Sequence, residues 1–301
     1  MYDALDRLLT FDPGERGVEA LHTAADTDQP PVEAAARMLR AVGTDGSSIL
    51  VTTGFPIPPD EQPETDGPPG TLVVVRALQA MGCEPVVVAE PIVEQPLTAG
   101  ADVLGLDELL FEPITPESTP TAIGEQLLNR YQPSAVMAIE RPGRTADGTY
   151  RSMTGADITA AVAHIDPLFE AARGREIPTI GIGDGGNEIG MGRIRSTVKA
   201  EIDQGDQIAA TTTVDHLVVA GVSNWGAYGL VTALEGLTGS ALLHDSTTER
   251  ALLEACCAAG CVDGREGVSA PQVDGLSTSL NEHIVGILRQ LGKRARCKNK
   301  S

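Results

Sequence analysis

Five short apolar runs alternate with segments of helical pattern along the chain, and this alternation limits the fold more than any other feature. Strands joined through helices form right-handed crossovers and a parallel sheet. We therefore expect a three-layer α/β/α fold with a mostly parallel, Rossmann-like sheet. The predicted strands span residues 48–53, 84–89, 134–139, 177–182 and 216–220. The predicted helices span residues 71–81, 121–131, 166–173, 226–237, 249–260 and 279–291.

Length and composition allow one sizeable hydrophobic core. The chain has 301 residues, 42% of them hydrophobic, which suffices for one large domain or two small ones. We expect a single α/β domain over residues 1–292 and a basic, disordered tail over residues 293–301. The five cysteines and five histidines form neither a disulfide framework nor a zinc-binding pattern.

The charge of the chain argues against several classes of function. Its formal net charge is −20 and is spread along the sequence, whereas nucleic acids and anionic membranes bind basic surfaces. No apolar run reaches the roughly 18 residues of a membrane span, and residues 1–10 lack a signal-peptide pattern. We expect a cytoplasmic protein that binds neither nucleic acid nor membrane. Its acidic, lysine-poor composition resembles that of proteins from high-salt environments.

Four polar, glycine-containing loops each follow directly after a predicted strand. The carboxyl ends of parallel strands lie on one edge of a sheet, and open α/β folds bind their ligands there. The loops together therefore predict a ligand site at this edge, independent of any family. They are TGFP at 53–56, ERPGR at 140–144, GDGGNE at 183–188 and GVSNWG at 221–226.

The third loop belongs to a glycine-rich run from Gly181 to Gly192. Its six glycines predict a backbone that turns tightly and approaches a ligand closely. Asp184 and Glu188 would repel a pyrophosphate, which argues against a dinucleotide site. The same carboxylates are hard oxygen ligands, so they either handle protons or hold Mg²⁺ or Mn²⁺.

A metal-dependent phosphatase is one alternative that this run suggests. The sequence from Gly183 is similar to the magnesium-binding motif of haloacid-dehalogenase phosphatases. Those enzymes also need an Asp-x-Asp nucleophile after an early buried strand, and the early candidate is Asp26-Thr27-Asp28. Residues 21–25 before it make a poor strand, so this interpretation is the weaker one.

Taken together, five segments resemble the D-glutamate cyclase family, from about residue 45 to 240 and more loosely over the whole chain. The resemblance implies conversion of D-glutamate to 5-oxo-D-proline and water by closure of an internal lactam. Mitochondrial members carry an additional N-terminal domain, for which we expect no room in this chain. The matching segments are TGFPIPP from Thr53, ETDGPPG from Glu64, ERPGRTADGTYRSMTGADI from Glu140, GIGDGGNEIGMG from Gly181 and GVSNWGAYGL from Gly221.

This reaction requires groups that move protons and stabilise charge. We assign Glu140 or Asp184 as the base that takes a proton from the ammonium group. Glu188 either serves as the acid or, with Asp184, holds a divalent metal. The backbone N–H groups of Gly185 and Gly186, with Asn187, are expected to hold the oxyanion.

The remaining candidates are expected to bind substrate. Arg141 and Arg144 can clamp a carboxylate bidentately, and their alternative is an ion pair with Glu140 or Asp147. Trp225 is expected either in the core or as a wall of the pocket. The other substrate-binding candidates are Thr53, Gly54, Asp66, Asp147, Tyr150, Ser223 and Asn224.

The sequence thus predicts a hydro-lyase that acts on D-glutamate or a similar acidic amino acid. Two alternatives stay open: a phosphatase that uses Asp184 and Glu188, and a non-catalytic protein that binds an amino acid in the same crevice. No cofactor is required beyond the Mg²⁺ or Mn²⁺ already considered. Assembly into a homo-oligomer also stays open.

Overall fold

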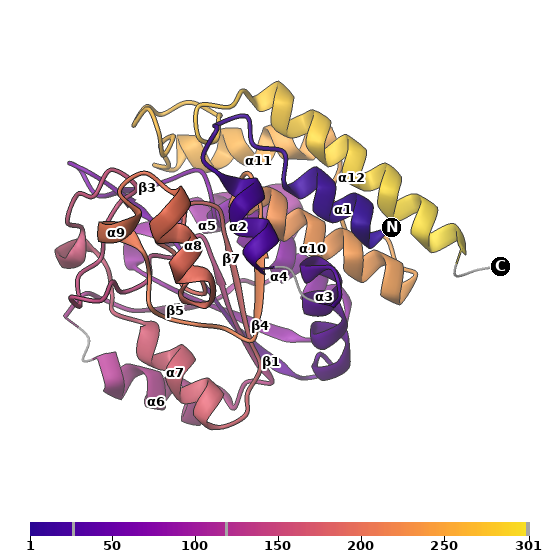
Figure 1. Cartoon of the computed structure of the whole chain (residues 1–301). Helices are drawn as coiled ribbons and strands as arrows, with labels where there is room; N and C mark the ends of the chain where they lie inside the picture. Colours follow the sequence, from indigo (N-terminus) through magenta and orange to yellow (C-terminus); the bar gives the residue numbers. More distant parts are fainter. Residues whose placement is uncertain (26–27, 118–119, 299–301) are drawn as a thin grey trace.

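A six-stranded parallel sheet forms the centre of the protein (Figure 1). The computed structural model describes residues 1–25, 28–117 and 120–298, and within them the strand order is β5-β4-β1-β6-β7-β8. The expected three-layer α/β/α fold is confirmed. The strands are β1 (Ser48–Thr53), β4 (Glu84–Ala89), β5 (Leu110–Pro113), β6 (Ala135–Ile139), β7 (Thr179–Gly183) and β8 (His216–Val219).

Helices cover both faces of the sheet, and the strand side chains alternate between two cores. In β1, Ile49 and Val51 face one core, and Leu50 faces the other. The larger core is covered by α1 (Tyr2–Leu9), α3 (Pro31–Val42), α4 (Pro68–Ala80), α5 (Pro91–Leu104), α10 (Ser223–Thr238), α11 (Ser246–Ala258) and α12 (Thr278–Lys298). The smaller core is covered by α2 (Val18–Ala25), α6 (Pro120–Tyr131), α7 (Asp166–Gly174), α8 (Arg195–Glu201) and α9 (Gly205–Ile208).

The five predicted strands are all present, whereas the edge strand β5 was not predicted. Its sequence, Leu-Phe-Glu-Pro, has no apolar run, and its residues are half-buried or exposed, as suits a strand paired on one side only. The N-terminal helices and α5 were also not predicted. Two short elements complete the loop after β1, namely β2 (Pro56–Ile57) and β3 (Gln62–Pro63), which pair as an antiparallel ribbon.

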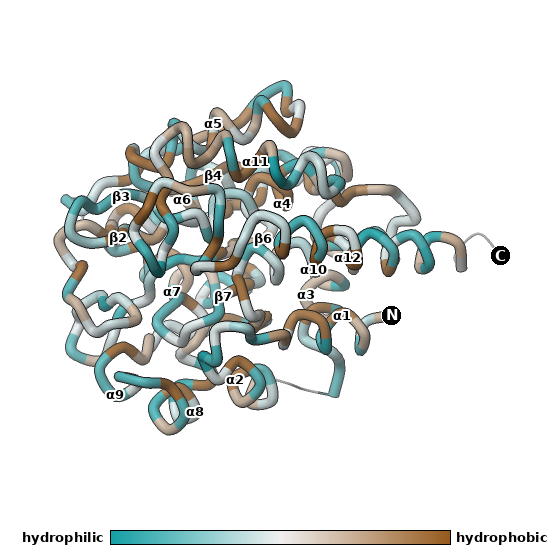
Figure 2. The backbone as a smooth tube through the Cα atoms, turned by 90° about the horizontal axis from the view of Figure 1, so that it is seen from above, coloured by the Kyte–Doolittle hydropathy of each residue, from teal (hydrophilic) through white to brown (hydrophobic). Residues whose placement is uncertain are grey.

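The basic segment after residue 292 is ordered as far as it is described, contrary to the expected disorder. Residues 293–298 continue α12, and Arg296 forms an ion pair with the buried Glu235 of α10. Residues 299–301 lie outside the described residues. Figure 2 shows hydrophilic and hydrophobic residues interspersed along α12, as expected for a helix with one face on the core. In the part of the chain that the structure describes, no helix has the length and hydropathy of a membrane span.

Candidate functional site

A cavity of about 500 Å³ lies at the carboxyl edge of the sheet. Loops that follow β1, β6, β7 and β8 contribute to it, as the alternation of strands and loops predicts. Two segments from the ends of the chain complete its wall: the loop with Gly14 and Arg16 between α1 and α2, and residues 264–276 before α12. Segments near both ends of the chain thus complete a site whose other residues follow the strands of the sheet.

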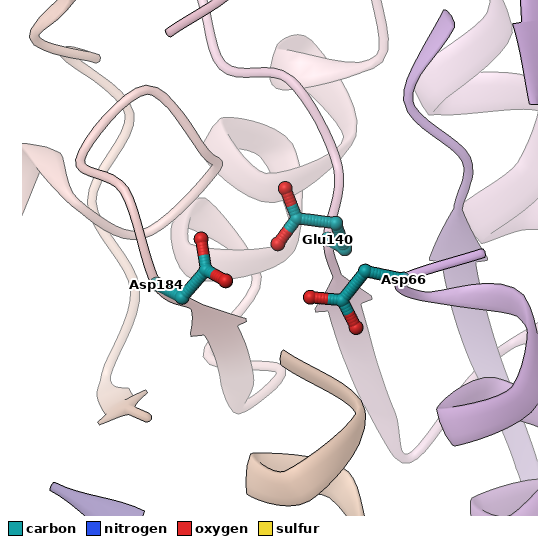
Figure 3. Close-up of side chains that lie close together, drawn as sticks. All are labelled: Asp66, Glu140 and Asp184. Atoms are coloured by element: carbon teal, nitrogen blue, oxygen red, sulfur yellow. The ribbon is translucent and has the colours of Figure 1, made fainter. Parts of the chain in front are cut away.

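Three buried carboxyl groups lie close together at this edge of the sheet, and two of them, Glu140 and Asp184, line the cavity (Figure 3). Asp66 precedes α4, Glu140 follows β6, and Asp184 follows β7. One carboxylate oxygen from each lies within 4.8 Å of the others, and the groups point toward one another. Carboxylates this close repel one another unless they share protons or a cation.

Asp66 is held by a reciprocal pair of helix caps. Its carboxylate accepts the backbone N–H groups of Ser223 at 2.8 Å and Asn224 at 2.7 Å, at the start of α10. Asn224 in turn accepts the N–H groups of Gly67 at 3.0 Å and Gly70 at 2.7 Å, at the start of α4. Each residue therefore caps the helix of the other, which fixes both helix starts at the site.

Glu140 is placed by its backbone and by a serine. Its φ of 44° is in the left-handed region, which is unusual for a residue with a side chain. Ser223 Oγ donates to Glu140 Oε2 at 2.5 Å. Gly67 lies against it, because a Cβ there would meet Glu140 Cβ at 2.9 Å and Thr53 Oγ1 at 2.7 Å. These contacts orient the carboxyl group toward the other two acids.

Arg16 spans the cavity wall and binds two acids. Its guanidinium lies 2.7 Å from Asp184 and 3.0 Å from Asp274, and it donates to the carbonyl of Gly221 at 2.6 Å. Although burial lowers the pKa of Arg16, Asp184 and Asp274 raise it well above its ordinary value. Its Nε–H is buried and has no hydrogen-bond partner among the described residues. Arg16 is therefore a permanent cation whose buried Nε–H is not taken up by any described residue.

The acids of the site hold protons more tightly than ordinary carboxyl groups. Burial raises the pKa of Asp66 to about 7, with a further contribution from Asp274. Burial raises the pKa of Glu140 well above its usual range, and the charges of Asp184 and Glu188 raise it further. Burial also raises the pKa of Asp184, although Arg16 lowers it. The cluster can therefore hold both proton donors and proton acceptors near neutral pH.

Glu188 does not face the cavity as predicted but closes the glycine-rich turn. Its Oε1 accepts the N–H groups of Asp184 at 2.7 Å and Gly185 at 2.6 Å, and its Oε2 accepts that of Gly186 at 2.6 Å. The predicted oxyanion donors are thus already occupied by an internal anion. This arrangement corrects the assignment of Glu188 as acid or metal ligand and that of Gly185 and Gly186 as an oxyanion hole.

The predicted arginine clamp is not present either. Arg141 is fully buried and forms a bidentate pair with Glu90, and it also donates to the carbonyl of Ala163 at 2.8 Å. Arg144 pairs with Glu170 at 2.6 Å at the surface. Neither lines the cavity, because their guanidinium groups are engaged elsewhere.

Four other candidates also lie outside the cavity lining. Asn187 donates to the carbonyl of Arg151 at 2.9 Å, and the exposed Asp147 accepts hydrogen bonds from Thr145 and Thr149, which lower its pKa to about 2. The hydroxyl of Tyr150 donates to buried Asp166, and Trp225 lies in the core, where its Nε1 donates to Asn281 at 2.7 Å.

Thr53 and Gly54 contact the buried Arg141 and not the cavity. Both carbonyl groups face the Arg141 guanidinium, at 3.3 and 3.4 Å. Neither residue lines the cavity. Of the candidates, Glu140, Asp184, Asp66, Ser223 and Asn224 are thus brought together.

Five charged residues of the cavity were not predicted, namely Arg16, Glu64, Arg265, Glu266 and Asp274. Glu64 could have been found, because it lies two residues before Asp66 in a segment already singled out. The others carried no local signal, since none follows a strand or lies in a glycine-rich motif. Their presence depends on how the chain ends pack over the sheet.

The structure does not support the phosphatase interpretation. Residues 18–25 form the helix α2, not a strand, and Asp28 after it is exposed. Asp26 and Thr27 lie outside the described residues. Among the described residues, the group whose geometry could hold a metal ion is Asp66, Glu140 and Asp184, and Glu188 is not part of it.

An open parallel sheet with a cavity at its carboxyl edge is the arrangement in which α/β folds bind their ligands. The chain belongs to the D-glutamate cyclase-like family: the family model described as "D-glutamate cyclase-like, C-terminal" matches residues 5–289. It is 35% identical, over 246 residues, to the human (Homo sapiens) protein "D-glutamate cyclase, mitochondrial". That match covers 76% of this chain and 38% of the human protein, so the chain spans well under half of its relative.

Proposed function

We propose that the protein is a hydro-lyase that closes D-glutamate to 5-oxo-D-proline and water. The observation that carries this proposal is the cluster of Asp66, Glu140 and Asp184 in a D-glutamate cyclase-like chain: their carboxylate oxygens lie within 4.8 Å of one another, and Glu140 and Asp184 line the cavity. The reaction needs groups that both take and give protons near neutral pH. A carboxyl cluster with raised pKa values supplies them.

The proton balance of the reaction explains why one base is not enough. D-glutamate carries an ammonium group and a γ-carboxylate, and the product is a neutral lactam. Two protons therefore leave nitrogen, and one γ-carboxyl oxygen departs with both as water. Ring closure joins two groups of one molecule, so the remaining barrier is the poor reactivity of these two ionised groups. The site must move protons from nitrogen to oxygen over a short distance.

Glu140 and Asp184 are the residues we assign to this transfer. The ionised member of the pair takes a proton from the ammonium group while the protonated member gives one to the γ-carboxyl oxygen; the two then exchange roles to move the second proton, so that water leaves and the pair returns to its starting state. Ser223 keeps the Glu140 carboxyl in place through its 2.5 Å hydrogen bond. The free Nε–H of Arg16 is the donor we assign to the developing oxyanion, in place of the glycine-rich turn.

Assay of the purified protein with each enantiomer of glutamate tests this proposal. We expect 5-oxoproline from D-glutamate, detected by chiral chromatography, and much less from L-glutamate. A parallel assay with EDTA, then with added Mg²⁺ or Mn²⁺, decides whether the three carboxyl groups work with protons alone or with a metal. No 5-oxoproline from either enantiomer would overturn the proposal. Thermal stabilisation by D-glutamate without turnover would instead indicate a binding protein.

A further inference from the structure

Among the described residues, one cation of the cavity has no partner that neutralises it. Arg265 lines the cavity from an exposed position. Its guanidinium has no ion pair or hydrogen bond among the described residues, whereas Arg16 is engaged by Asp184 and Asp274. The neighbouring acid Glu266 also lines the cavity; it accepts the side-chain amide of Gln272 at 2.9 Å and forms no ion pair with Arg265.

The backbone that carries Arg265 is held firmly although its side chain is free. The buried carboxylate of Asp263 accepts the N–H groups of Arg265 at 3.1 Å, Glu266 at 2.7 Å and Gly275 at 2.7 Å. The stem of Arg265 lies along Gly275, where a Cβ would be 3.5 Å from Arg265 Cδ. A guanidinium on a fixed backbone, without a partner of its own, is available to an anion that enters the cavity.

D-glutamate has one anionic group that takes no part in the reaction and that Arg265 can bind. The amine and the γ-carboxyl group react, so both lie at Glu140 and Asp184. The α-carboxylate does not react, and placing it among Glu64, Glu140 and Asp184 would add another negative charge to an acidic wall. It therefore needs a cation away from the cluster.

We propose that Arg265 binds the α-carboxylate of the substrate and thereby makes the enzyme specific for amino acids whose α-carboxylate is free. This inference rests on the proposed function and names the substrate class of that site. γ-Carboxyl compounds whose α-carboxyl group is an amide or lies within a peptide bond lack the charge that Arg265 recognises, and they should be poor substrates.

Comparison of D-glutamate with its α-amide tests the role of Arg265. We expect Arg265→Gln to raise KM for D-glutamate about tenfold with little change in kcat, because a charge-assisted hydrogen bond is lost from substrate binding. The preference for D-glutamate over the α-amide should fall by a similar factor. Arg265→Lys should keep part of that preference. Arg40→Gln is the matched control, since Arg40 is also exposed but lies on α3, outside the cavity lining.

The outcomes separate this inference from the proposed reaction. An unchanged preference in Arg265→Gln, with wild-type turnover intact, would overturn the role of Arg265 alone. If the wild type makes no 5-oxoproline but calorimetry shows D-glutamate binding that Arg265→Gln weakens and Arg40→Gln does not, the reaction fails and the role of Arg265 stands. A wild type that neither binds nor converts D-glutamate would overturn both.

Discussion

The carboxylate of Glu188 accepts the backbone N–H of Gly186 at 2.6 Å, so the glycine-rich turn carries its own anion. The same carboxylate also binds the N–H groups of Asp184 and Gly185. A turn of this kind often receives a phosphate or carboxylate from a ligand. Here the Glu188 carboxylate of the same chain occupies that position, and the turn holds Asp184 toward the cavity.

Glu188→Gln should therefore reduce stability. The amide has one oxygen to offer three N–H groups, and its NH₂ group faces one of them, which leaves a buried donor unpaired. We expect a loss of about 2–4 kcal/mol in the free energy of unfolding, measured by urea denaturation. Glu170→Gln is the control, because Glu170 pairs with Arg144 at the exposed surface. Equal stabilities of the two variants would contradict this role.

Glu140→Gln should abolish turnover while the fold is retained. The amide keeps the shape of the side chain but cannot exchange a proton with Asp184 or with the substrate. We expect kcat to fall by about 10²- to 10⁴-fold, with a circular dichroism spectrum like that of the wild type. Glu94→Gln, on the exposed face of α5, should leave kcat unchanged. Wild-type turnover in Glu140→Gln would exclude Glu140 from the proton transfer.

The two arginines after β6 should differ in their effects. Arg141→Gln leaves the buried Glu90 without its cation, so we expect a loss of about 3–5 kcal/mol of stability. Arg144→Gln removes a surface ion pair and should cost about 0–1 kcal/mol, with KM for D-glutamate unchanged. Thermal denaturation and steady-state kinetics measure both effects. A raised KM in Arg144→Gln would restore the predicted substrate clamp.

The unliganded protein should lose stability as the pH rises through the neutral range. A carboxyl group whose pKa is raised by folding binds more protons in the folded state than in the unfolded state. Its contribution is therefore full at low pH and is lost as the pH rises from the ordinary carboxyl range toward the folded pKa. For Asp66 this window extends up to about 7, and Glu140, Asp184 and Glu64 act in the same direction.

Glu64→Gln offers a direct measurement of this effect. Burial raises the pKa of Glu64 well above its usual range, and its buried Oε1 has no hydrogen-bond partner among the described residues. The amide removes one titrating group, so the variant should gain stability relative to the wild type as the pH increases from 5 to 8. Urea denaturation across that range measures the difference, with Glu94→Gln as a surface control. A difference that does not change with pH would show that Glu64 is not responsible.

The sheet could be predicted well because the signal for each central strand lies in that strand's own sequence. Each central strand is a short apolar run, and a parallel sheet brings the following residues to one edge, so Glu140, Asp184 and Ser223 were expected together. The roles of the arginines could not be predicted in this way. Arg141 and Arg16 have the same chemistry, but Arg141 meets Glu90 in the interior while Arg16 reaches Asp184 across 168 positions of sequence. Only tertiary packing distinguishes the two.

The left-handed backbone conformation at Glu140 lowers the stability of the fold at a position whose carboxyl group faces the cavity. A side chain in this conformation costs about 1 kcal/mol or more relative to glycine, which adopts it freely. The chain nevertheless carries a glutamate here, between β6 and Arg141, which forms the buried ion pair with Glu90. A glycine at this position would relax the turn and remove the carboxyl group that faces the cavity. The protein thus gives up some resistance to unfolding and keeps, at the cavity, the carboxyl group to which we assign the proton transfer.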